Sequence, residues 1–118
     1  MIPLSLIFFA VAAVAGLTMA IMHFRGVSPP RAALAVLHGL FAASGLVVLL
    51  LALIKVGFGG KAGIALGLLV VAALGGFALL SFHAKGQRLP SALVVGHALL
   101  AVSGFLTLLL SEYAILTQ

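Results

Sequence analysis

The four histidines of this chain lie in two copies of one short pattern. The first copy begins with His-Phe-Arg-Gly at residues 23–26 and continues to His38, and the second begins with His-Ala-Lys-Gly at residues 83–86 and continues to His97. The offset is 60 residues at the first histidine of each copy and 59 at the second. Imidazole is the commonest metal ligand in proteins, and it exchanges protons near neutral pH. Any chemical function should therefore be built from these four side chains.

Few other side chains could share that chemistry. The chain has no cysteine, and Glu112 is its only acidic residue. Thiol chemistry, Ser-His-Asp triads, paired carboxylates and carboxylate metal cages are therefore excluded. A small transporter is disfavoured, because ion-coupled transporters generally use an acidic side chain inside the membrane. We expect no enzymatic activity from the chain on its own, although it could be a non-catalytic subunit of an oxidoreductase.

The composition places the chain in a membrane. Of its 118 residues 65% are hydrophobic and only 6% are charged, whereas soluble domains have about 25% charged residues. Four apolar segments each exceed the ~20 residues that cross a bilayer as a helix. The sequence predicts an all-α integral membrane protein with helices at about 3–24, 31–54, 62–83 and 90–112, followed by a short polar tail. Short loops make neighbouring helices antiparallel, so we expect an up-down-up-down bundle.

The bundle is expected to form a single transmembrane domain over residues 1–118, made of two tandem helical hairpins at about 3–54 and 62–113. Breakers such as Pro29 and Pro30 end the first helix. The net charge of +5 comes from basic residues in the loops and does not indicate nucleic-acid binding. The positive-inside rule puts the first and third loops in the cytoplasm and both termini outside, and we expect a bacterial inner membrane. The expected cytoplasmic side carries four basic residues, Arg25, Arg31, Lys85 and Arg88, and the expected outer side carries two, Lys55 and Lys61.

His38 and His97 lie about seven residues inside the second and fourth helices, at a depth of roughly 10 Å. These two helices are diagonal in such a bundle, so the imidazoles can clamp a planar metal macrocycle, as in bis-histidine ligation of a b-type haem. Gly45 and Gly104 follow seven residues later and could open a slot for the ring. The alternative is that the histidines form hydrogen bonds inside the bundle and the glycines serve close helix packing.

His23 and His83 lie near the membrane surface at the ends of the first and third helices. Together with Arg25 and Lys85 they could hold haem propionates or bind a quinol. A second possibility pairs His23 with His38 and His83 with His97 in two metal sites. A third leaves the two outer histidines extended toward water without any ligand.

With this helix count and the His38/His97 and Gly45/Gly104 pattern, the chain resembles small multi-helix b-type cytochromes and haem-bearing membrane anchors of respiratory complexes. The resemblance implies an electron-transfer protein or an accessory subunit of a respiratory or photosynthetic complex, with other membrane subunits or a second copy as partners. Many such cytochromes place histidine pairs near both membrane faces, whereas all four histidines here lie toward one face. This difference favours one haem in one leaflet, or none. The alternatives are a cofactor-free structural or assembly subunit and a chlorophyll- or copper-binding subunit.

Overall fold

The protein is described by a computed structural model that covers residues 1–27 and 32–118. The described residues form four helices and no strand: α1 (Ile2–Phe24), α2 (Ala32–Val56), α3 (Gly60–Ala84) and α4 (Ser91–Leu116). Each helix is long and apolar enough to cross a membrane, which confirms the predicted all-α membrane bundle. The predictions made for Pro29, Pro30 and Arg31 lie outside the described residues.

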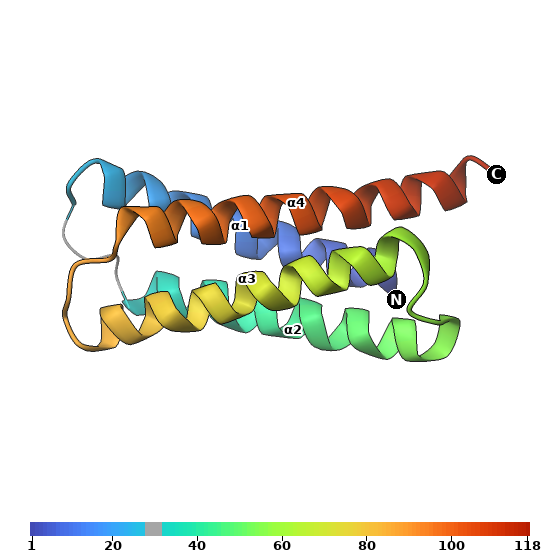
Figure 1. Cartoon of the computed structure of the whole chain (residues 1–118), viewed down its shortest axis with the longest axis horizontal. Helices are drawn as coiled ribbons and strands as arrows, with labels where there is room; N and C mark the ends of the chain where they lie inside the picture. The colour runs from blue at the N-terminus through green and yellow to red at the C-terminus, as the bar shows by residue number, and fades with distance from the viewer. Residues whose placement is uncertain (28–31) are drawn as a thin grey trace.

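The helices run up, down, up and down along one long axis (Figure 1). The end of α1, the start of α2 and the α3–α4 connection lie at one end, called here the loop end, and the α2–α3 connection and both termini lie at the other, the terminal end. Packing is most extensive within the hairpins α1–α2 and α3–α4, while α1–α4 and α2–α3 close the ring. Helices α2 and α4 are therefore diagonal, as predicted.

The helix bounds differ from the prediction mainly at the C-terminus. Helix α4 continues to Leu116, so the predicted polar tail after residue 112 was wrong. The reason is that the last turn contains an apolar run with no glycine or proline to stop it. A single acid, Glu112, does not end a helix because glutamate is a good helix former.

The His-x-basic-Gly pattern ends α1 and α3 in the same way. Gly26 and Gly86 have φ angles of 73° and 65°, a left-handed conformation that glycine adopts without strain. The Gly26 N–H donates to the His23 carbonyl at 3.2 Å, and the next N–H along the chain donates to the Met22 carbonyl at 3.0 Å. The second repeat forms the same two bonds. This is a Schellman cap, so the glycine of the pattern has a structural role.

We expect Gly26→Ala to lower the stability of the bundle by about 1 kcal/mol, because alanine is strained in the left-handed conformation. Thermal unfolding in detergent, followed by circular dichroism, measures the effect. Gly67→Ala is the matched control, because a Cβ at that helical glycine meets nothing within 4 Å. Equal destabilisation by the two substitutions would contradict the assigned role of Gly26.

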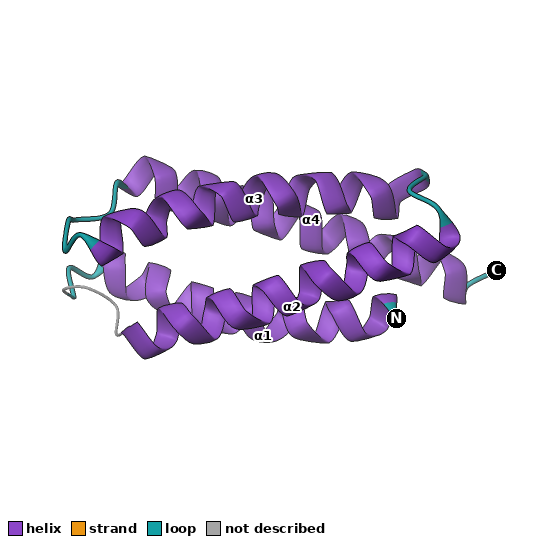
Figure 2. Cartoon of the chain, turned by 90° about the horizontal axis from the view of Figure 1, so that it is seen from below, coloured by secondary structure: helices purple, strands orange, loops and turns teal. Residues whose placement is uncertain are grey.

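The central core occupies only part of the bundle. The buried residues that pack together from all four helices are Phe9, Leu49, Leu53, Ala62, Ala65, Leu69 and Leu108. All of them lie on the terminal side of the histidines along their helices. The ribbons of the two hairpins are furthest apart in the middle part of the bundle and lie closer together at both ends (Figure 2). The histidines thus lie where the central hydrophobic packing has ended.

Candidate functional site

The imidazoles of His38 and His97 meet across the α2–α4 diagonal. Their ring centroids are 5.9 Å apart and their planes are inclined by 79°. Each histidine lies six residues inside its helix from the loop end, which is roughly 9 Å along the axis. The structure therefore brings together, at one depth, one histidine from each half of the duplicated sequence.

Each ring is anchored to the other helix of its own hairpin. The Nδ1 atom of His38 donates to the Ala12 carbonyl, and that of His97 donates to the Ala72 carbonyl, both at 2.7 Å. A carbonyl only accepts, so Nδ1 carries the hydrogen and the lone pair of the neutral ring is on Nε2. No described residue forms a hydrogen bond with either Nε2. An Nδ1–H donated to a backbone carbonyl is the usual arrangement of a metal-binding imidazole.

Two glycines make these anchors possible. Gly16 and Gly76 each follow the accepting alanine by four residues and lie one helical turn along the same face. A Cβ at Gly16 would lie 2.9 Å from Cε1 of His38, and one at Gly76 would lie 3.1 Å from Cε1 of His97. Sequence reasoning had assigned these glycines no part in the site. The signal that could have found them is the offset of 60 residues at which both the alanine and the glycine recur.

Gly45 and Gly104 lie against side chains of their own hairpins, and their predicted part in a cofactor slot stays a prediction. A Cβ at Gly45 would lie 2.8 Å from the Phe9 ring, and one at Gly104 would lie 2.7 Å from the Leu69 side chain. Phe9 and Leu69 are themselves 60 residues apart, so the same contact is repeated in both hairpins. These contacts are the close packing within each hairpin that the sequence allowed as the alternative.

The outer histidines lie at the loop end and differ from each other. His23 Nε2 and Ser91 Oγ share a hydrogen bond of 3.0 Å that joins α1 to α4. The Nδ1 atom of His83 is buried and has no hydrogen-bond partner among the described residues. Arg25 and Lys85 are the exposed C-cap residues of α1 and α3, where a positive charge is favourable next to the negative end of the helix dipole.

The two alternative metal sites predicted from the sequence have little support in this geometry. His38 lies against His97, the partner from the other hairpin, and the outer His23 is engaged by Ser91. In residues 1–27 and 32–118 no group of three or more His, Cys, Asp or Glu side chains could hold a metal ion. The arrangement offers two facing nitrogen ligands and no third.

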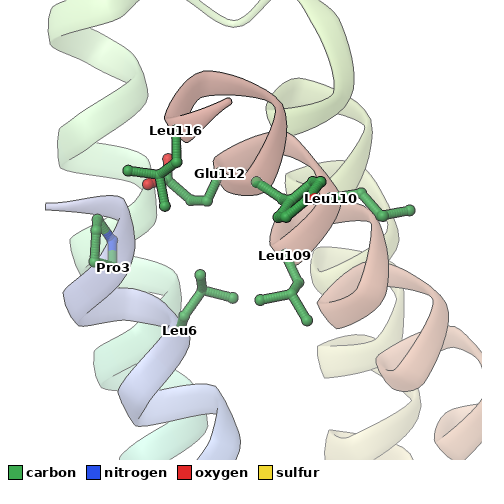
Figure 3. Close-up of a pocket in the computed structure, with 7 residues that line it drawn as sticks. Pro3, Leu6, Leu109, Leu110, Glu112 and Leu116 are labelled. Atoms are coloured by element: carbon green, nitrogen blue, oxygen red, sulfur yellow. The ribbon is translucent and has the colours of Figure 1, made fainter. Parts of the chain in front are cut away.

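The single acid belongs to a separate feature at the terminal end. A groove of about 550 Å³ lies between the first turns of α1 and the last turns of α4 (Figure 3). Glu112 is its one acidic member, and the carboxylate lies close to the N-terminus of α1, where the helix dipole favours negative charge. The groove is lined by Pro3, Leu6, Leu109, Leu110, Glu112, Tyr113 and Leu116.

Comparison with protein-family models, curated proteins and solved structures finds no match for this chain. The function therefore has to be argued from the geometry of the histidine site itself.

Proposed function

We propose that this chain binds one haem b between His38 and His97 and acts as a membrane electron-transfer protein or as an accessory subunit of a respiratory or photosynthetic complex. The observation that carries the proposal is the pair of anchored imidazoles whose centroids are 5.9 Å apart. A metal ion held between two imidazoles requires a centroid separation of roughly 6 Å, because each metal–nitrogen bond is about 2 Å long.

The number of ligands favours a macrocycle over a bare ion. Structural and catalytic zinc sites use three or four protein ligands, and calcium or magnesium needs several oxygen ligands. The described residues offer only the two imidazoles and no larger cluster. A haem supplies four nitrogens of its own, so two axial histidines complete its coordination. Chlorophyll uses a single axial ligand, which fits two facing histidines less well, and a two-coordinate copper(I) ion is the remaining alternative.

The diagonal placement also determines which helices flank the ring. A planar group held by His38 of α2 and His97 of α4 would have α1 and α3 on its two remaining sides. Helices α1 and α3 end at the loop end with Arg25 and Lys85 as their C-cap residues. Basic side chains there suit haem propionates, and a quinone could exchange electrons at the same end. The site lies in one leaflet, so electrons would pass to a partner on that side.

The positive-inside rule supports a cytoplasmic loop end, with both termini outside and the bacterial inner membrane as the location. In that topology the redox partner or quinone would be reached from the cytoplasmic leaflet. The long apolar surfaces of the helices contact lipid, and parts of them would contact other membrane subunits or a second copy of the chain.

A cofactor-free structural or assembly subunit is the second candidate. Its supporting observation is that the two Nδ1 hydrogen bonds fasten α1 to α2 and α3 to α4 without any ligand. In this case His38→Ala weakens assembly but leaves the absorption and metal content of the protein unaltered.

Visible spectroscopy of the purified protein distinguishes a haem-binding protein from a cofactor-free subunit. We expect a Soret band and a shift of that band on reduction with dithionite, together with about one iron per chain. Protein produced with an ample haem supply that lacks both the bands and the iron would contradict the haem proposal. Copper in the metal analysis, or chlorophyll bands in the spectrum, would identify the corresponding alternative.

A further inference from the structure

The two seams between the hairpins differ at the loop end. On the α1–α4 seam, His23 Nε2 and Ser91 Oγ are joined at 3.0 Å. The repeat places His83 in the position of His23, and α2 begins with Ala32 where α4 begins with Ser91. A methyl group cannot form the hydrogen bond that the serine hydroxyl provides. Among residues 1–27 and 32–118, the α1–α4 seam therefore has a polar bridge at the loop end and the α2–α3 seam has no equivalent bridge.

The hydrogen-bonding capacity of the His83 side chain is not satisfied at its Nδ1 atom. Its Nδ1 atom is buried without a partner among the described residues, and most buried polar atoms in proteins are hydrogen-bonded. A neighbouring oxygen that accepted a hydrogen bond from this nitrogen would remove an unfavourable contribution to stability. The residues that follow His83 in the α3–α4 connection include Lys85 and Arg88 but no acid. The surroundings therefore favour an anionic oxygen brought by a ligand.

We propose that haem enters the bundle through the α2–α3 seam and that His83 donates a hydrogen bond to one haem propionate, while the His23–Ser91 bridge keeps the α1–α4 seam closed. This inference rests on the proposed haem function and refines it. A ring held by His38 and His97 would have α3 on one side, and the last turn of α3 carries His83. The equivalent histidine on α1 is already engaged, so the two edges of the ring are held differently.

Titration of the haem-free protein with haem b in detergent micelles tests the assignment. We expect His83→Ala to weaken haem affinity roughly tenfold, the effect of losing one charge-assisted hydrogen bond. His23→Ala is the matched control in the other repeat and should stay within about twofold of the unmodified protein. Haem dimethyl ester, which has no propionate charge, should bind the unmodified protein about tenfold more weakly than haem and should be insensitive to His83→Ala.

Ala32→Ser tests whether haem enters through the α2–α3 seam. The new hydroxyl offers His83 the kind of hydrogen-bond partner that Ser91 provides for His23. We expect haem to associate several-fold more slowly with this variant, while the occupied protein keeps its spectrum. The inference would be overturned if His23→Ala weakened haem affinity as much as His83→Ala does. It would also be overturned if His83→Ala weakened binding of the dimethyl ester as much as that of haem, or if Ala32→Ser left the rate of haem association unchanged. Failure of the unmodified protein to take up haem would instead contradict the proposed function.

Discussion

Replacing either His38 or His97 with alanine is expected to remove the low-spin haem spectrum of the protein. Each imidazole supplies one of the two axial ligands, and no third His, Cys, Asp or Glu side chain in the described part of the chain is close enough to replace the missing one. A single remaining histidine would hold the haem only weakly. The absorption spectrum and the iron content of each purified variant measure the loss, and added imidazole should restore part of the lost coordination.

The control for these variants is His23→Ala, which removes a histidine from the same end of the bundle. Its ring is 7 residues from Gly16 along α1, roughly 10 Å from the level of the His38 and His97 pair, so the low-spin spectrum should remain. Retention of the full spectrum in both His38→Ala and His97→Ala would exclude the bis-histidine site. It would favour the structural role, in which His38 only fastens α2 to α1.

The fold could be predicted from the sequence because the apolar segments that determine it are long and the helical hairpin is repeated. Apolar segments separated by short loops predict antiparallel spans, and the recurrence of His38 as His97 predicts two rings at one depth. The structure bears out the four-helix bundle and shows the two rings side by side. Their role as metal ligands stays a prediction, because proximity of two imidazoles is compatible with hydrogen bonding alone.

The details that position the rings were harder to predict. Glycine in a membrane helix usually indicates close helix packing, so the residue type alone did not separate Gly16, which backs an imidazole, from Gly45, which accommodates Phe9. The difference depends on how each helix is rotated, which hydrophobic periodicity cannot give when a helix is apolar on every side. The unequal seams depend on one position, Ser91 against Ala32, at which the repeat itself is broken.

Gly16→Ala is expected to weaken haem binding about 10- to 100-fold, the usual effect of disturbing a group that orients a metal ligand. The added methyl would lie 2.9 Å from Cε1 and 3.0 Å from Nδ1 of His38. The ring must then move off the helix, which breaks the 2.7 Å bond to the Ala12 carbonyl. Without that bond the hydrogen is no longer held on Nδ1, and Nε2 is no longer fixed as the ligand atom.

Haem titration of the variant, with circular dichroism to verify that the helices persist, measures this effect. Gly39→Ala is the matched control, because it lies next to His38 in the chain and a Cβ there meets nothing within 4 Å. Gly76→Ala should have a smaller effect, since its Cβ would lie 3.1 Å from the nearest atom of His97. The loss of haem affinity should be largest for Gly16→Ala, smaller for Gly76→Ala and smallest for Gly39→Ala. This order follows from the distances between the added Cβ atom and its nearest neighbours. Equal losses at all three positions would show that general helix packing, and not the anchoring of the imidazoles, controls the site.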